Sequence, residues 1–231
     1  MQSEDRPIHF STELIHPPRQ HKVPVLQKLY FALSQVRGVG YESTDFSPPG
    51  PPKFYSRRGP KSQSLAVFLP DRLLVVEEWV DIPLPTFLDK VETVASHAMT
   101  ELGIGPIAVQ TATVRTTFAL THFEDARVFL LDHACRQEGR IGPYLGRPVA
   151  VGGLRFVLPE TPEHRGTLHV TVESYRHSRN EVYVEVKGVF ANQRVDRESL
   201  DAIRTNIVMV RSFINERIHP FLDQFDTAEQ V

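Results

Sequence analysis

The chain has 231 residues, enough for one large or two small domains whose core needs neither disulfides nor structural metal. Its 26 Lys and Arg nearly balance 28 Asp and Glu, so the molecule lacks the long-range field that draws proteins onto nucleic acid or anionic membranes. The single cysteine, Cys135, excludes an intramolecular disulfide framework and a multi-cysteine zinc site.

The apolar stretches are too short and too interrupted to span a bilayer. The N-terminal stretch "MQSEDRPIHF" contains acids and no apolar core, which predicts that it is not a signal peptide. We therefore expect a cytoplasmic protein.

A strand and a helix open the chain. Apolar and polar residues alternate in "PIHFSTELIH" (residues 7–16), which predicts a half-buried strand with Phe10 inward and His9 outward. In "VPVLQKLYFALSQVRG" (residues 23–38), apolar residues recur at helical spacing. Pro24 suits the first helical turn and Gly38 is placed to end the helix.

The first half continues with a long turn, a hairpin and a second helix. Residues 46–64, "FSPPGPPKFYSRRGPKSQS", predict a proline-rich turn, and "SLAVFLPDRLLVVEEWV" predicts a hairpin turned at Pro70 and Asp71. The hairpin strands are apolar on both faces, so a subunit partner or residues 46–64 must cover them. The helix predicted for residues 84–103 ends at Gly103 and buries Phe87, Leu88, Val91, Val94, Ala95, Ala98 and Leu102.

From residue 107 the same order of elements begins again. "IAVQTATVRTTFALT" predicts a strand, "FEDARVFLLDHACRQEG" a helix, "GRPVAVGGLRFVLP" a strand and "ETPEHRG" (residues 160–166) a loop. "TLHVTVESYRHSRNEVYVEVKGVF" predicts a hairpin that turns near Ser178 to Asn180. A last helix is expected from Asp196, its N-cap, to His219, before Pro220.

A repeated order of elements is hard to produce by chance. We therefore predict an α+β fold of two tandem strand–helix–strands–helix repeats, residues 1–105 and 106–231, packed as one globular unit. The repeats are expected to form one curved antiparallel sheet with a pseudo-twofold axis and helices on one face. This order looks like a duplicated TATA-binding-protein-like or helix-grip fold.

The run from "SYRHSRNEVYVEVKGVF" through "LDAIRTNIVMVRSFINERIHPFLDQF" also resembles a sporadically distributed bacterial protein family. That family has no defined biochemical role, so the resemblance transfers no functional residues.

If helices cover the apolar face, the strands define what the opposite face offers. That face mixes both charges, is slightly acidic and includes tyrosines, whereas a DNA-gripping saddle would carry many Lys and Arg. It suits a protein partner or a small molecule, or it is simply a solvated face. Its candidate binding residues are His9, Glu13, Arg115, His169, Glu173, Tyr175, Tyr183 and Glu185.

Residues 47–64 occupy the place in the first half that residues 160–166 occupy in the second, so they are an enlarged turn rather than a linker. The prolines fix extended backbone, and "PPGPP" could dock in an aromatic groove. Phe54 and Tyr55 are expected to pack over the apolar strands. The candidate binding residues of this turn are Lys53, Phe54, Tyr55, Arg57, Arg58 and Lys61.

Motifs for chemistry are missing from the sequence, which contains no HExxH, CxxC, DxDxDG, GxGxxG or GxSxG. Glu77 and Glu78 are neighbours in a strand and face opposite ways, so they cannot easily share a proton. Cys135 is expected to be a buried thiol. Two histidine pairs lack metal-binding spacing: His16/His21 and His164/His169. We therefore predict no metal, no cofactor and no catalytic residue.

These patterns favour a non-enzymatic interaction or regulatory protein that presents the sheet face and the basic proline-rich turn to a partner, and that forms a homo-oligomer. Two alternatives stay open. One is a helix-grip-like domain that binds a small molecule, with or without catalysis, between helices and sheet. The other is weak nucleic-acid binding through the proline-rich turn, which is not favoured.

Overall fold

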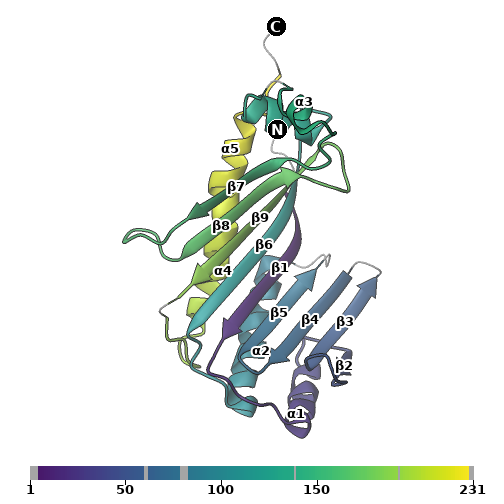
Figure 1. Cartoon of the computed structure of the whole chain (residues 1–231). Helices are drawn as coiled ribbons and strands as arrows, with labels where there is room; N and C mark the ends of the chain where they lie inside the picture. The colour runs from purple at the N-terminus through teal and green to yellow at the C-terminus, as the bar shows by residue number, and fades with distance from the viewer. Residues whose placement is uncertain (1–4, 60–61, 79–82, 138, 192, 229–231) are drawn as a thin grey trace.

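The computed structural model describes residues 5–59, 62–78, 83–137, 139–191 and 193–228. In this part of the chain, nine antiparallel strands form one sheet in the order β2-β3-β4-β5-β1-β6-β9-β8-β7 (Figure 1). The α+β prediction is confirmed. The strands are β1 (Asp5–Ile15), β2 (Ser43–Asp45), β3 (Lys53–Gly59), β4 (Ser62–Leu69), β5 (Arg72–Glu78), β6 (Val109–Ala119), β7 (Gly153–Leu158), β8 (Thr167–Ser174) and β9 (Glu181–Phe190).

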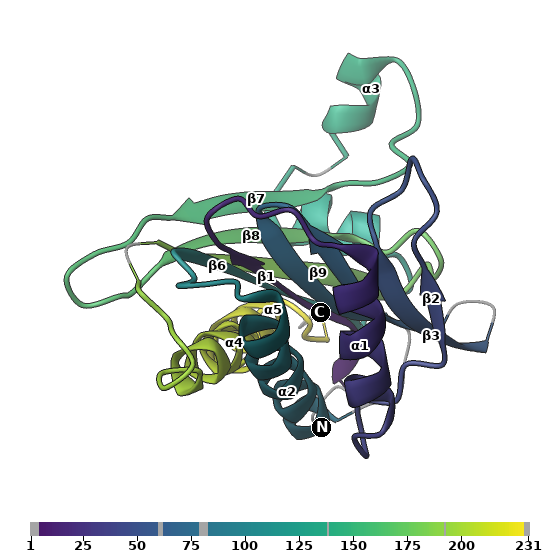
Figure 2. The same ribbon diagram turned by 90° about the horizontal axis from the view of Figure 1, so that it is seen from below.

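The long helices α1, α2 and α4 pack on one face of this sheet (Figure 2). The helical segments are α1 (Val23–Ser34), α2 (Leu84–Leu102), the π-helical η1 (Val128–Ala134), α3 (Ile141–Leu145), α4 (Asp201–Phe213), the π-helical η2 (Ile214–Ile218) and α5 (His219–Asp223). In Figure 2, α1, α2 and α4 lie side by side beneath the strands. The other face is turned toward the viewer in Figure 1, and none of these three helices covers it.

β1 and β6 form the centre of the sheet. They pair antiparallel from Ile15 opposite Val109 to Asp5 opposite Phe118, with a bulge between Pro7 and His9. β5 pairs with the other edge of β1, and β9 pairs with the other edge of β6. Each central strand therefore carries a three-stranded meander, β5–β4–β3 on one side and β9–β8–β7 on the other.

The predicted turn at residues 46–64 is wrong over residues 53–59, which form strand β3. β3 pairs with β4 and β2, and its Phe54 side chain is fully buried. The Phe54 ring centroid lies 4.6 Å from that of Phe68 and 5.4 Å from that of Tyr30 on α1. The side chains of this short stretch alternate between the two faces of the sheet, and the backbone of β3 pairs with the outer edge of β4. The adjacent prolines hide that signal in the sequence.

Two helix predictions also need correction. The helix expected to extend to residue 139 ends at Ala134, and Cys135 is half-buried just after it. A second, unpredicted segment, α3, follows. It buries none of its side chains and stands away from the sheet (Figure 2).

The last helix begins at Asp201 and continues to Asp223, not from Asp196 to His219. Asp196 instead caps a preceding turn, because its Oδ1 accepts hydrogen bonds from the backbone N–H of Glu198 (3.1 Å) and from Ser199 Oγ (2.9 Å). Pro220 lies at the start of α5, directly after the π-helical segment η2. α1 likewise ends at Ser34, four residues before Gly38.

Candidate functional site

The open face of the sheet carries a continuous row of polar side chains. Cross-strand pairing places eight residues in line from β3 to β7, and we call them the central row: Arg57, Gln63, Glu78, His9, Arg115, Glu185, Thr171 and Arg155. Side chains directly opposite one another on neighbouring strands share a face and are close enough to interact. Opposite charges alternate along the row, so its total charge stays small.

Short hydrogen bonds connect the middle of the central row. Arg115 Nε donates to Glu185 Oε2 at 2.6 Å, and the Tyr183 hydroxyl donates to the same oxygen at 3.0 Å. Gln63 Nε2 donates to Glu78 Oε2 at 2.5 Å. Burial and the Glu185 carboxylate raise the pKa of Tyr183, so this phenol remains a hydrogen-bond donor at neutral pH.

His9 lies at the centre of this row and is largely buried. Burial, and next the Arg115 guanidinium, lower the pKa of His9 to about 4. Its Nε2 lies 2.9 Å from Ser11 Oγ, and its Nδ1 is 3.8 Å from Glu78 Oε1. His9 is therefore a neutral imidazole near pH 7.

An apolar patch adjoins the central row on β4 and β5. Leu65 and Val67 stand opposite Val76 and Leu74, and these four residues define the patch. All four point to the open face, away from α1 and α2, because the alternate residues of both strands fill the core beneath those helices. The prediction that these strands are apolar on both faces is confirmed.

The two sets of predicted binding residues meet at this patch. Lys53 and Tyr55 of β3 stand opposite Val67 and Leu65, and Lys53 Nζ and Arg57 Cζ each lie 5.9 Å from the Tyr55 ring centroid. Phe54 points into the core and cannot contact a partner. Lys61 lies outside the described residues, and the Arg58 side chain is likewise not described.

The remaining predicted residues are spread over the same face. Glu13 pairs with Arg72, with 3.1 Å between Oε2 and Nη1. Tyr175 stacks on Tyr183 with a centroid distance of 6.2 Å and an interplanar angle of 9°. On the paired strands β8 and β9, Glu173 lies opposite Tyr183, and His169 lies opposite Lys187.

The sequence interpretation missed a buried polar cluster beneath α2. Lys90 Nζ donates to Glu77 Oε1 (2.5 Å) and to Ser64 Oγ (2.9 Å), and Ser64 Oγ donates to Glu77 Oε1 (2.7 Å). Burial, and then the Glu77 carboxylate, raise the pKa of the nearby Tyr41. These side chains are almost fully buried, so no substrate reaches them. The signal was available, because Lys90 interrupts the apolar face of the α2 sequence.

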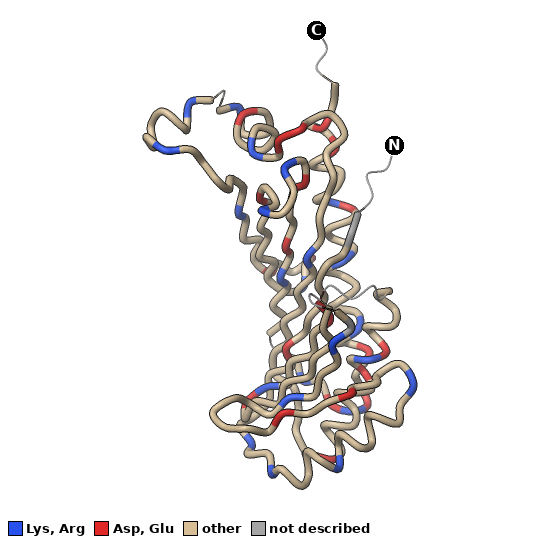
Figure 3. Tube along the Cα trace, turned by 90° about the vertical axis from the view of Figure 1, so that its right-hand side faces the viewer, with Lys and Arg blue, Asp and Glu red and all other residues tan. Residues whose placement is uncertain are grey.

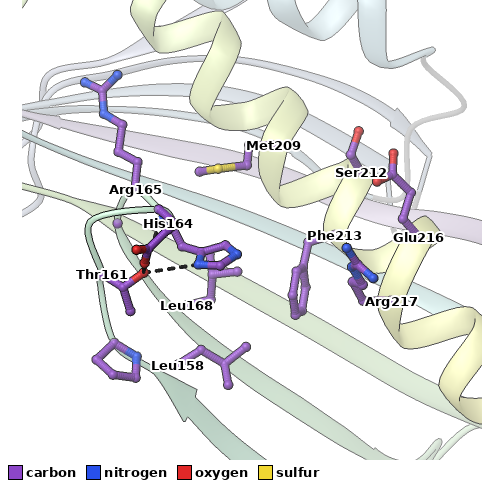
Figure 4. A pocket seen from close by; sticks show the side chains of 13 residues that line it. Leu158, Thr161, His164, Arg165, Leu168, Met209, Ser212, Phe213, Glu216 and Arg217 are labelled. Atoms are coloured by element: carbon purple, nitrogen blue, oxygen red, sulfur yellow. Dashed lines mark hydrogen bonds between the residues drawn. The ribbon is translucent and has the colours of Figure 1, made fainter.

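A groove opens on the helix side of the sheet, between the β7–β8 hairpin and α4–η2. It encloses about 620 Å³. Figure 4 shows its apolar side chains, which come from strands and helix alike: Leu158, Leu168, Met209 and Phe213. His164, whose Nδ1 lies 3.1 Å from Thr161 Oγ1, and Arg217 lie beside them.

Among the residues that the structure describes, no three His, Cys, Asp or Glu side chains gather where they could share a metal ion. None of the described helices has the length and hydropathy that crossing a membrane requires. No protein-family model matches the chain, and no curated protein matches it significantly.

Proposed function

We propose that this protein is a non-enzymatic interaction protein and that the open sheet face binds a protein partner. The observation that carries this proposal is the apolar patch of β4 and β5, which adjoins the polar central row on a face that α1, α2 and α4 leave uncovered. Within the patch, Leu65 and Leu74 are partly exposed, and Val67 and Val76 are buried. An apolar centre with a polar rim that contains Tyr and Arg is the usual composition of a protein interface.

The charges of this face support a protein partner over nucleic acid. The cations of the central row alternate with Glu78 and Glu185, and Arg115 is paired with Glu185. Along the whole described trace, acidic and basic positions are interspersed (Figure 3). A phosphate-binding surface would concentrate Lys and Arg without matching acids. The expected partner surface is apolar, with charges of both signs at its border.

Hydrogen bonds within the central row also support binding over catalysis. Glu78 already accepts from Gln63, and Glu185 accepts from Arg115 and Tyr183. Both carboxylates are therefore already engaged by donors within the row.

The proposal is tested by comparing partners captured by the wild-type chain, by Leu74→Lys and by Val208→Lys. Leu74 belongs to the apolar patch, whereas Val208 is an exposed apolar residue of α4 and serves as the matched control. We expect Leu74→Lys to lose a specific partner that Val208→Lys retains, with both variants folded by circular dichroism. Identical partners for all three proteins would contradict the proposal.

The groove beside α4 favours a second candidate function, the binding of an amphipathic small molecule. Its volume of about 620 Å³ lies in the usual range for ligand sites, and Arg217 and His164 offer contacts for an anionic group. The anionic dye ANS is a suitable probe. Its fluorescence is expected to rise with the wild-type protein and not with Met209→Trp, which fills the groove. An equal rise with both proteins would contradict this use of the groove.

We further propose that the two halves are copies of one ancestral unit, related to helix-grip or TATA-binding-protein-like folds and to the sporadically distributed bacterial family that the C-terminal run resembles. Two features support the duplication: β1 and β6 meet at the centre, and each continues into a three-stranded meander of the same connectivity. Separate expression of residues 1–105 and 106–231 tests it. Folded or mutually complementing fragments are expected, and two unfolded fragments that do not associate would oppose it.

A further inference from the structure

Exposed apolar side chains concentrate in one segment of the second half. Among the large apolar residues of the described chain, nine are exposed, and six of these lie between residues 128 and 158: Val128, Tyr144, Leu145, Phe156, Val157 and Leu158. Tyr144 on α3 is 90% exposed, and Val157 on β7 is 53% exposed. Exposed apolar side chains gathered in one segment point to an interaction site.

β7 is also an unprotected sheet edge. It pairs only with β8 among the described strands, contains no proline and has Arg155 as its single charge. Sheet edges normally avoid pairing by being short, charged or covered. The opposite edge, β2, is three residues long and polar. The two ends of the sheet thus differ in whether they can accept another strand.

The backbone of β7 shows which groups are available for pairing. The Gly152 carbonyl accepts a hydrogen bond from Ser174 N–H (2.9 Å), so the antiparallel ladder points even-numbered residues of β7 toward β8. The N–H and C=O groups of Arg155 and Val157 therefore point away from β8, toward the edge. They are available without any change to the β7–β8 ladder.

We propose that β7 pairs antiparallel with β7 of a second copy of this chain, so that one sheet continues through a twofold-symmetric dimer. A strand that pairs with itself in antiparallel orientation satisfies twofold symmetry directly. We infer that the partner is a second copy because the outward-pointing N–H and C=O groups of β7 can pair with the same groups of another β7. The interface uses the sheet edge rather than the open face, so the inference does not depend on the proposed function.

Side-chain chemistry selects the register of this pairing. With Phe156 on the axis, Leu154 stands opposite Leu158 of the second copy on the helix side, and Arg155 stands opposite Val157 on the open side. Centring the axis on Arg155 would set two guanidinium groups against each other, which is unfavourable. Centring it on Val157 would place Pro159, which has no N–H, opposite Arg155. Phe156 on the axis avoids both.

The same pairing places α3 near the second copy. In an antiparallel pair, the start of each strand lies beside the end of the other. The segment with α3 leads into the start of β7, so it is brought toward the β7–β8 loop of the second copy, on the side of the sheet from which α3 projects (Figure 2).

The oligomeric state of the full chain tests the proposal. Sedimentation of the wild-type protein over a range of concentrations is expected to show a dimer. Val157→Pro removes an N–H that only the dimer uses, and it should weaken the dimer by roughly 10- to 100-fold in dissociation constant. Phe31→Lys, which changes another exposed apolar residue on α1, is the control and should leave the dimer unchanged. A wild-type monomer at all concentrations would overturn the proposal.

Opposite charges at one position test the register. Val157→Glu would face Arg155 of the second copy and should preserve or tighten the dimer, whereas Val157→Lys should weaken it. If both variants weaken the dimer equally, the register is wrong. If Leu74→Lys dissociates the dimer while Val157→Pro does not, the copies associate through the open face and the β7 proposal fails.

A cross-link tests the axis directly. In a Cys135→Ser background, Phe156→Cys places two thiols opposite each other in a non-hydrogen-bonded pair, where side chains approach most closely. Copper phenanthroline, a mild oxidant, is expected to convert this variant to a covalent dimer. Phe31→Cys in the same background should stay monomeric in a denaturing gel. Equal cross-linking of both variants, or of neither, would contradict the proposed axis.

Discussion

The two ends of the sheet differ in how their outer strands are covered. At one end, α1 packs on β3 and β4, and Phe54 of β3 is fully buried. At the other end, Phe156 of β7 is 40% exposed beside an open groove. In this protein, the outer strand of a meander is buried only at the end where a long helix covers it.

The sequence explains this difference. α1 runs for twelve residues and buries Leu26, Leu29 and Leu33. The segment at the corresponding place in the second half is split into η1 and the five-residue α3, with Gly142 and Pro143 inside the second piece. Glycine and proline weaken helices most, so no continuous helix forms there to cover β7 and β8.

The inner faces of the two halves also differ in polarity. One row of the helix-side face runs through Ser64 and Glu77 in the first half and through Val186 and Val170 in the second. Lys90 of α2 neutralises the buried Glu77 carboxylate, whereas the second half needs no such partner.

The largest effect is expected from breaking that ion pair. Lys90→Ala leaves the Glu77 carboxylate buried without its partner and removes the packing of the lysine stem. It should lower the free energy of unfolding by about 5 kcal/mol. Urea denaturation measures this loss. Lys28→Ala is the control, because Lys28 forms an exposed ion pair with Glu101 and should cost under about 1 kcal/mol.

A double variant identifies the cause of the Lys90 effect. Replacing Glu77 by Gln in a Lys90→Met protein removes the orphaned charge, so it should recover part of the stability that Lys90→Met loses. If the double variant is no more stable than Lys90→Met, packing rather than charge explains the loss.

The next largest effect is expected from truncating the phenylalanine at one end of the sheet, and truncating the one at the other end should cost much less stability. Phe54→Ala should cost roughly 4 kcal/mol of unfolding free energy, because it leaves a cavity under α1. Phe156→Ala should cost under about 1 kcal/mol, because its ring is already partly in water. Both are measured in a Val157→Pro background, so that self-association does not contribute. Equal losses would mean that the second end is covered after all.

A smaller effect concerns pH and His9, where the halves join. The pKa of His9 is about 4 in the folded protein and 6.5 in the unfolded chain, so the unfolded state binds the proton first as pH falls. This stabilisation is complete above pH 6.5 and is lost between pH 6.5 and 4, by about 3 kcal/mol in total. His21, whose pKa is also lowered by burial, titrates in the same direction. The difference between wild type and His9→Gln therefore isolates the His9 contribution.

If the stability of His9→Gln falls as steeply as that of the wild type between pH 6.5 and 4.5, then His9 does not have the lowered pKa. Measurements should stop near pH 4.5, because the carboxylates begin to titrate below that value.

Alternation and helical spacing predicted most of the regular elements, among them the central strands, the hairpin turn at Pro70 and Asp71, and the buried face of α2. These patterns depend on neighbours within one element. The pattern failed at β3, because its alternation covers only seven residues and adjoins a run of prolines. It failed at α4 because the start of that helix depends on a local turn at Asp196 rather than on a cap.

The candidate site was predictable residue by residue but not as an arrangement. Alternation placed His9, Arg115 and Glu185 on one face, as the structure does. Alternation within one strand does not reveal how neighbouring strands are aligned, so it could not show that Glu78 and Gln63 complete the same row. The pKa of His9 also depends on burial and on Arg115 from another strand, so the sequence alone could not reveal it.

The smallest effect should come from the contact that links the helices of the two halves. Arg204 on α4 lies 2.6 Å from Asp89 and 3.2 Å from Glu92 on α2, and all three side chains are substantially exposed. Solvent and salt screen such a pair, so Arg204→Gln should cost about 0.5 kcal/mol or less, and the cost should shrink further at high salt. Denaturation at low and high ionic strength measures both values. A loss of several kcal/mol that persists in salt would mean that the halves are joined by this contact, rather than by the β1–β6 ladder and the apolar core.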